Sequence, residues 1–299
     1  MLFRSHTALG ELFDDYRDAG YNFIRVFGMY NNPRRDDKPG GWGIGRFIPS
    51  EYAGRYYEGL GPFWQFAADH GLRVEFVVFA DTQAIMPGAD AQLAHWAPFV
   101  TGYLWPETTA LIEAVNENDQ TINRVDALFQ LQRPTWTLAS HGSNGNAQWP
   151  VWPAWDYIGF HMSGFEWHRK AAHNCFEIGW LVAASGNWRG PCVANETQRG
   201  GTPPNGDAFS TAVAYSVGRA GALLPAGTYY HNYHGKYSEP WDDVERGQAA
   251  AFAAGAHSLP LDCQDGGNYV HRQDLENVDI LRVYQRDARA DCLAPIPVR

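Results

Sequence analysis

The sequence predicts an α/β fold, a (β/α)8 barrel of eight parallel strands and eight helices, with a short C-terminal appendage. Strand-like runs rich in Val, Ile and Phe alternate with helical patterns over residues 1–258, and strands separated by helices form parallel sheets through crossover connections. Eight such units match the size of this barrel. A doubly wound sheet is the main alternative, but no Gly-x-Gly-x-x-Gly turn of the dinucleotide-binding kind follows residues 22–27.

The expected strands rest on β-branched and aromatic residues, which pack well in sheets. They occupy residues 2–4, 22–27, 73–79, 111–115, 135–139, 157–160, 192–194 and 228–230. Helices are expected where apolar residues recur with the helical period. They occupy residues 7–19, 61–70, a stretch from about 89, 122–132, 166–184, 208–223 and 241–256.

The C-terminal segment, residues 259–299, does not continue the alternation. We expect it to pack on the barrel, since a segment of this length would bury too little surface to form its own core. Cys263 and Cys292 flank this segment, and either a disulfide between them or free thiols fits their positions. The four cysteines form no CxxC pair, which disfavours a zinc knuckle.

Charge and hydropathy exclude several classes of partner. The net charge of −10 disfavours nucleic-acid binding, which normally requires a basic face. We expect no membrane partner, because no apolar run is long enough to span a bilayer, and we expect a monomer. No signal-peptide core is visible at the start, so secretion or attachment to a virion would require a trimmed start, and the location stays open.

Aromatic residues are the first indication of a ligand. They make up 14% of the chain, and many stand beside Gly, Pro, Asn and His in expected loops. Flat apolar faces with polar rims suit sugar rings, although a large aromatic core gives the same composition. The long expected loop at residues 28–59 holds Trp42, Tyr52, Tyr56 and Tyr57. Because so long a loop is usually functional, we expect Trp42 and the tyrosines to line a substrate groove.

The active site of such a barrel lies at the carboxyl ends of its strands. Polar side chains at or near the expected strand ends are therefore candidates for substrate binding or catalysis. They are Arg25, Asp81, Asn116, Glu117, His141, His161, Glu196, His231 and Tyr233.

Two glutamates carry the chemistry in this interpretation. Glu117 and Glu196 end the fourth and seventh expected strands, roughly opposite each other across the barrel mouth. Glycoside hydrolysis uses two such carboxyls, one to protonate the leaving oxygen and one to attack the anomeric carbon. Either glutamate alone would most simply be an exposed loop residue, so the argument rests on the pair. A retaining mechanism requires the two carboxyls to lie about 5–5.5 Å apart.

These positions resemble the clan A glycoside hydrolases, the cellulase-like retaining (β/α)8 enzymes. Residues 20–25, Gly-Tyr-Asn-Phe-Ile-Arg, resemble the clan's second strand, and Asn116-Glu117 resembles its fourth-strand Asn-Glu pair. Glu196 matches the nucleophile on strand seven, and His161 resembles a residue near that nucleophile.

The resemblance implies a role for each matching residue. Glu117 would be the acid/base and Glu196 the nucleophile, Arg25 would keep that nucleophile ionised, and Asn116 would bond the sugar 2-hydroxyl. The sequence departs from the clan at Asn118, where a proline is usual, at Gln83, where the cellulase family has a histidine, and in lacking the strand-eight Trp. Tyr233 or Trp241 is a candidate for that last place. These departures leave the family within the clan, the sugar, the linkage and endo or exo action open.

Other site chemistries are disfavoured. The histidines fit sugar binding better than a metal centre, because no His-x-His pair stands on the first strand, so we expect no metal and no organic cofactor. Glu75 and Glu113 share the parity of Asp81 and Glu117, and we expect them to form a polar layer inside the barrel with an arginine. The alternative to an enzyme that acts on a β-glycan is a carbohydrate-binding barrel without turnover, such as an adhesin or a viral surface module.

Overall fold

The computed structural model describes residues 6–31, 46–52, 54–102, 110–118, 120–137, 139–140, 155, 158–161, 192–196, 215 and 243–257. The chain divides into two compact units. The first comprises residues 1–156 and 234–242, and the second comprises residues 157–233 and 243–299.

The first unit contains a four-stranded parallel sheet. Its strands are β1 (Phe23–Phe27), β4 (Arg73–Phe79), β5 (Leu111–Val115) and β6 (Ala139–Ser140), and they lie side by side in chain order. A classic doubly wound sheet places its first strand in the interior and reverses direction there. Among the described strands no such reversal occurs, because β1 pairs with β4 alone. This order is the one that a barrel requires.

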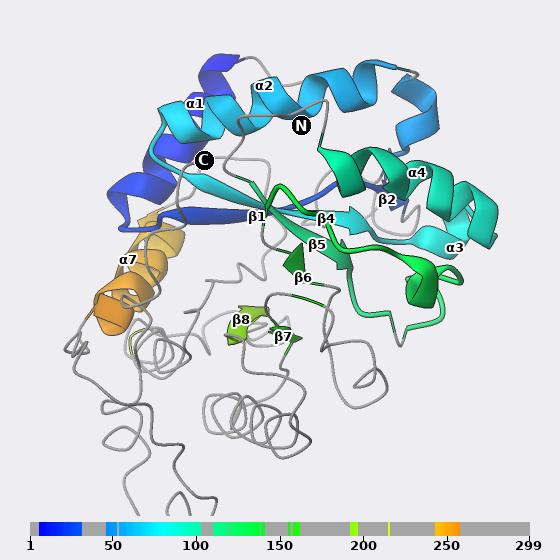
Figure 1. Ribbon diagram of the computed structural model, residues 1–299. Coiled ribbons are helices and arrows are strands. Elements are labelled where there is room, and N and C mark those ends of the chain that lie inside the picture. Colours follow the sequence, from blue (N-terminus) through cyan, green and yellow to red (C-terminus); the bar gives the residue numbers. More distant parts are fainter. Residues whose placement is uncertain are drawn as a thin grey trace, which may run out of the picture. The chain divides into compact units, whose positions relative to one another are not determined.

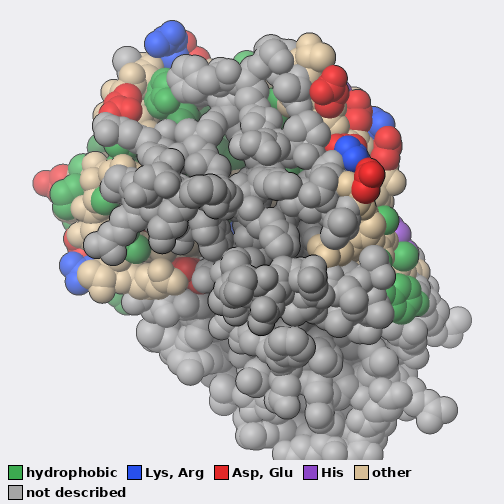
Figure 2. Space-filling model, turned by 180° about the vertical axis from the view of Figure 1, so that it is seen from behind, with side chains coloured by type: hydrophobic (Ala, Val, Ile, Leu, Met, Phe, Trp, Pro, Cys, Tyr) green, Lys and Arg blue, Asp and Glu red, His purple; other side chains and the backbone are tan. Residues whose placement is uncertain are grey.

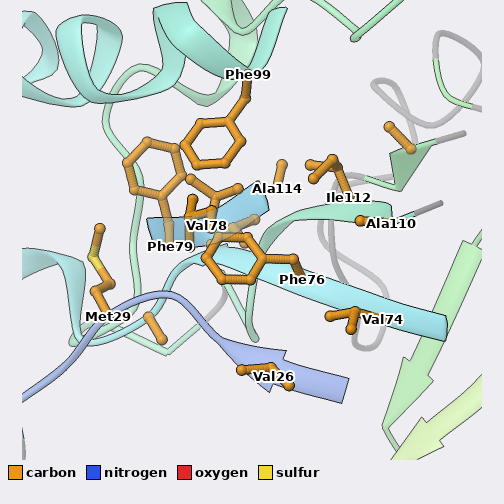
Figure 3. Packing of buried hydrophobic residues seen from close by; sticks show 14 of the residues in the cluster. Val26, Met29, Val74, Phe76, Val78, Phe79, Phe99, Ala110, Ile112 and Ala114 are labelled. Carbon is orange, nitrogen blue, oxygen red and sulfur yellow. The ribbon is translucent and has the colours of Figure 1, made fainter. Parts of the chain in front are cut away.

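Three helices cover one face of this sheet (Figure 1). They are α1 (His6–Asp18), α2 (Arg55–Asp69) and α4 (Ala89–Thr101), while the short α3 (Thr82–Ile85) follows β4. Each long helix contributes large buried side chains to one hydrophobic cluster, among them Phe13, Trp64 and Phe99. Figure 3 shows part of this cluster, including Phe99. Phe76 of β4 contacts both Trp64 and Phe99, with ring centroids 5.4 and 5.9 Å away.

Strand β4 is the centre of the core. Every residue from Val74 to Phe79 is buried. Continuous burial is typical of parallel strands covered on both faces. The expected strands at residues 73–79 and 111–115 are confirmed with the same bounds, and those near residues 22 and 192 with small shifts.

The connection after β1 differs from the expected long loop. It contains the antiparallel pair β2 (Tyr30–Asn31) and β3 (Arg46–Phe47) and the 3-10 helix η2 (Pro49–Tyr52), and α2 begins at Arg55. The expectation that its tyrosines line a groove is wrong for Tyr56, which is fully buried and donates a hydrogen bond to the Gly28 carbonyl at 2.8 Å. Trp42 lies outside the described residues.

The backbone at Gly28 explains this burial. A Cβ at Gly28 would lie 2.5 Å from the Phe76 ring and 2.8 Å from the Tyr56 hydroxyl. Glycine therefore allows the end of β1 to pack directly on these two aromatic side chains.

The helix expected at residues 122–132 is also wrong. The segment consists of turns and the short 3-10 helix η3 (Leu128–Gln130). Side-chain amides take the place of helical partners, because Asn118 Oδ1 accepts from the Val125 amide at 2.7 Å and Gln92 Oε1 accepts from the Ala127 amide at 2.9 Å. Such bonds compete with a regular helix.

The second unit contains the parallel pair β7 (Ile158–His161) and β8 (Cys192–Glu196), and the helix α7 (Asp243–His257). These elements confirm the expected strands at residues 157–160 and 192–194 and the expected last helix, with ends shifted by at most two residues. The other elements expected beyond residue 161, the strand at residues 2–4 and the appendage at 259–299 lie outside the described residues. The predicted boundary after residue 258 stays a prediction. No described helix combines the length and hydropathy needed to cross a membrane.

Candidate active site

A buried ion pair lies on the inner face of the sheet. The register pairs Arg25 with Glu75, and Val77 with Glu113, which places the three charged side chains on one face. Arg25 donates from Nε and Nη2 to the two carboxylate oxygens of Glu113, each at 2.7 Å, and its Nε lies 4.0 Å from Glu75 Oε2. This two-pronged geometry is the strongest form of an arginine–carboxylate pair. The predicted polar layer with an arginine is confirmed.

The same arginine orients Asn116. Arg25 Nη2 lies 2.9 Å from Asn116 Oδ1. An arginine can only donate, so the carbonyl side of the Asn116 amide must face it. The NH2 group of Asn116 is then the part that can donate to a ligand. The backbone of Asn116 is fixed as well, because its backbone N–H donates to the Phe79 carbonyl at 2.9 Å.

Glu117 follows Asn116 in a left-handed backbone conformation, with φ of 43°. Such a conformation is rare outside glycine and costs about 1–3 kcal/mol. The side chain is buried, and Gln120 donates from Nε2 to Glu117 Oε2. Strain of this kind concentrates at functional sites, so Glu117 stays a candidate for such a site.

Asp81 occupies the matching position on the neighbouring strand. Phe79 pairs with Val115, so Asp81 and Glu117 each lie two residues beyond paired positions. Asp81 is also buried, with φ of 49°. Asp81 and Glu117, two acidic residues with left-handed backbone conformations, are therefore neighbours at the carboxyl end of the sheet.

Asp81 forms hydrogen bonds to two segments of the chain that lie near the end of β4. Its Oδ2 accepts from the Asn31 amide of β2 at 2.8 Å, and its own amide donates to Asn123 Oδ1 at 2.8 Å. Asp81 thus ties β2 and the turn after β5 to the end of β4. The sequence left open whether Asp81 lines the cleft or caps the strand end, and nothing in it marks Asn31 and Asn123 as the partners of Asp81.

In the second unit, two candidates end adjacent strands. His161 ends β7 and pairs in register with Glu196, which ends β8. Glu117 belongs to the first unit and Glu196 to the second, so the expected carboxyl separation stays a prediction. His141, His231 and Tyr233 lie outside the described residues. Within the described ranges no three or more His, Cys, Asp or Glu side chains are grouped to hold a metal ion.

Comparison with known proteins identifies the fold. No protein-family model matches the chain, and no curated protein matches it in sequence. Among solved structures it is similar to an endo-β-1,4-mannanase from Thermotoga petrophila, at 13% identity and a TM-score of 0.52, over 86% of this chain and 75% of that one. It is also similar to the hyperthermostable endo-1,4-β-D-mannanase of T. petrophila RKU-1, solved with maltose and glycerol, at 13% identity and a TM-score of 0.51, over 85% of this chain and 96% of that one.

This likeness bears on the fold alone. The chain has the (β/α)8-barrel fold that its strand pattern predicts. It is the fold expected from the resemblance to the clan A glycoside hydrolases.

Proposed function

We propose that the protein is a retaining glycoside hydrolase that cleaves β-glycosidic bonds of a poly- or oligosaccharide. The observation that carries the proposal is the end of β5. There a buried carboxyl on a left-handed backbone, Glu117, follows an amide, Asn116, whose carbonyl side is held by Arg25. The barrel fold shared with two endo-mannanases supports it.

Glu117 protonates the glycosidic oxygen while Glu196 attacks the anomeric carbon. The bond to the leaving group breaks, and a covalent glycosyl-enzyme forms on Glu196. Glu117, now ionised, removes a proton from water, whose oxygen attacks the same carbon and releases Glu196. The hydrogen bond from Gln120 fixes the orientation of the Glu117 carboxyl during both steps.

Asn116 binds the substrate next to the acid/base. Its NH2 group donates to a sugar hydroxyl, and Arg25 holds the amide in that orientation. Trp42, His141, His161, Tyr233 and His231 contribute further contacts to the glycan in this proposal. Asp81 keeps the β2 connection in place.

Soluble β-mannan is the first substrate to test, because the two solved structures described above are endo-mannanases. Glucomannan and carboxymethyl cellulose complete the comparison. New reducing ends would establish hydrolysis. Retention on a glycan gel without new reducing ends would instead identify a carbohydrate-binding barrel.

The roles of the two glutamates separate in their response to azide. Glu117→Ala should stop turnover of β-mannan. It should still form the glycosyl-enzyme from a dinitrophenyl β-glycoside, which needs little protonation to leave. Azide needs no base, so it should restore turnover and give the β-glycosyl azide, identified by proton NMR. Glu196→Ala should lose activity even on the activated substrate, and azide should give the α-azide.

Asp81→Ala is the matched control, because Asp81 is also a buried, left-handed carboxylate at a strand end. Its activity should fall without any azide rescue. Rescue of Asp81→Ala, or wild-type turnover in both glutamate variants, would contradict the assignment.

A further inference from the structure

Phe27 is an exposed aromatic ring beside the candidate active site. It is the last residue of β1 and lies two positions after Arg25, on the same face of the strand. The Arg25 guanidinium carbon lies 4.9 Å from the centre of its ring. Phe27 is 36% exposed, whereas the large apolar side chains of β4 are buried.

The backbone around Phe27 is fixed. The Gly28 amide donates to the Val77 carbonyl at 2.7 Å, and the Gly28 carbonyl accepts from the Tyr56 hydroxyl at 2.8 Å. Exposure of Phe27 is therefore not the result of a loose strand end. The fixed backbone therefore holds a partly exposed apolar ring at the carboxyl end of β1.

The surroundings point to a small polar ligand with an apolar face. The guanidinium that contacts the Phe27 ring also bonds Asn116, which precedes Glu117. The Arg25 guanidinium thus contacts both a flat apolar ring, that of Phe27, and a hydrogen-bonding side-chain amide, that of Asn116. This combination fits a sugar ring, which has C–H faces and hydroxyl edges. A single exposed ring is too small for a stable protein interface.

We propose that Phe27 is the platform on which the sugar unit bound by Asn116 stacks. This inference rests on the proposed function and adds to it a residue that contacts the substrate. Arg25 keeps the ring in place through its cation–π contact. The same arginine therefore positions both the stacking surface and the amide.

The test compares three variants. Phe27→Leu keeps apolar volume but removes the flat ring, and Phe27→Tyr keeps the ring. Phe129→Leu is the matched control, since Phe129 is 74% exposed on η3 and belongs to no strand end. Steady-state hydrolysis of glucomannan gives kcat and KM. Calorimetric titration of mannohexaose into the same variants combined with Glu117→Ala gives the affinity without turnover.

Phe27→Leu should bind mannohexaose about tenfold more weakly and raise KM by a similar factor, which is the loss expected for one stacking contact. Phe129→Leu should match the parent protein in each assay, Phe27→Tyr should recover most of the affinity that Phe27→Leu loses, and all should share the parent's melting temperature. Equal affinity of Phe27→Leu and the parent for mannohexaose would contradict the proposed role of Phe27 but not the proposed hydrolysis. Binding that depends on Phe27 without any new reducing ends would overturn the hydrolase and keep the platform. Absence of both binding and hydrolysis would overturn both.

Discussion

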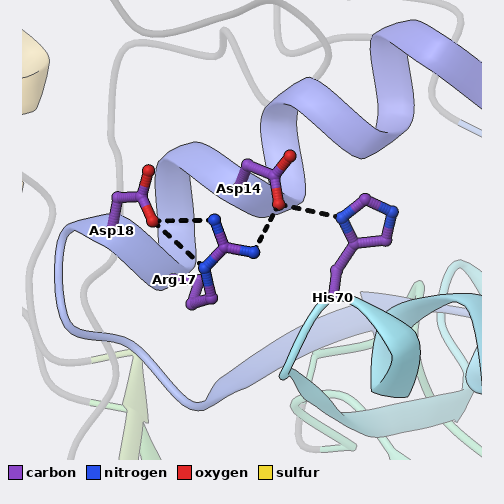
Figure 4. Close-up of polar contacts among 4 residues, drawn as sticks. All are labelled: Asp14, Arg17, Asp18 and His70. Atoms are coloured by element: carbon purple, nitrogen blue, oxygen red, sulfur yellow. Dashed lines mark hydrogen bonds and ion pairs between the residues drawn. The ribbon is translucent and has the colours of Figure 1, made fainter.

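Two regions of the first unit contain the same interactions in different surroundings. Inside the sheet, Arg25 pairs with Glu113 at 2.7 Å. On the surface, Arg17 of α1 pairs with Asp14 at 2.7 Å and with Asp18 at 2.8 Å (Figure 4). The distances are alike, but the Arg25 and Glu113 side chains are 7% and 0% exposed, and those of Arg17 and Asp14 are 45% and 43% exposed.

Exposure decides what each pair contributes. Water and salt screen exposed charges, and their ion pairs add little stability. Figure 2 shows acidic and basic side chains of the described residues interspersed on one face, as is usual for such pairs. A buried charge that loses its partner cannot be solvated, so breaking a buried pair is costly. The comparison teaches that a contact distance alone does not tell which of two ion pairs contributes more to stability.

Two histidines show the same contrast between a buried group, His95, and a group near the surface, His70. His95 of α4 contacts the Tyr57 hydroxyl through Nδ1 at 2.7 Å and packs against the rings of Phe79 and Phe99. Burial lowers the pKa of His95 to about 3. His70 contacts Asp14 through Nδ1 at 2.9 Å near the surface, where it links α1 to the end of α2 (Figure 4).

The largest expected effect on stability comes from breaking the buried ion pair between Arg25 and Glu113. Glu113→Ala should lower the free energy of unfolding by about 3–5 kcal/mol, because it leaves the Arg25 charge buried without its main partner. Urea denaturation measures this change. Glu113→Gln, which keeps the shape and loses the charge, should lie between Glu113→Ala and the parent.

Asp14→Ala is the matched surface variant, and its midpoint in urea should stay close to that of the parent. A similar loss in Asp14→Ala and Glu113→Ala would show that burial does not separate the two regions. If the proposed function holds, Glu113→Gln should also lower kcat when it is assayed well below its melting temperature, because Arg25 then orients Asn116 less firmly.

An intermediate effect concerns the pH dependence of stability. A histidine with a lowered pKa in the folded state, here about 3, is neutral there, while the unfolded chain takes up a proton near pH 6.5. The unfolded state then binds more protons, so stability should fall with decreasing pH across this interval by about 1.4 kcal/mol per pH unit. Chemical denaturation of the parent and of His95→Phe at several pH values measures the contribution.

His95→Phe should remove this part of the slope. His70→Gln, the surface counterpart, should retain it. An unchanged slope in His95→Phe would mean that other groups cause the acid sensitivity.

The smallest expected effect sharpens the surface side of the comparison. The hydrogen bond from His70, with Arg17 nearby, lowers the pKa of Asp14 below its ordinary 3.8. A lowered carboxyl pKa contributes stability above the unfolded value, and that contribution is lost as the pH falls through the folded value. The difference between the parent and Asp14→Asn should therefore be small at neutral pH and should shrink as the pH falls below about 3.8. Scanning calorimetry at low salt and at about 1 M salt should show that salt also removes it.

Much of the first unit could be predicted from its sequence. The strands β4 and β5 are apolar runs that a single glutamate interrupts in each, Glu75 and Glu113, and runs of this kind are typical of buried strands in a parallel sheet. Arg25, Asp81, Asn116 and Glu117 follow from counting to the strand ends, because in this fold those ends meet at one edge. Alternation along β4 and β5 was enough to place Glu75 and Glu113 on the inner face.

Only the tertiary structure decided which of these side chains meet. Arg25 and Glu113 are 88 positions apart in the chain, and their pairing depends on the register between strands, which no local pattern encodes. The left-handed backbones of Asp81 and Glu117, the burial of Tyr56 and the loss of the helix at 122–132 share this cause. Each depends on hydrogen bonds or packing with distant residues, which can outweigh a local preference of a few tenths of a kcal/mol per residue. Sequence periodicity thus determined the strands and their polar ends, while long-range packing determined the partners of each polar group and the exposure of Phe27.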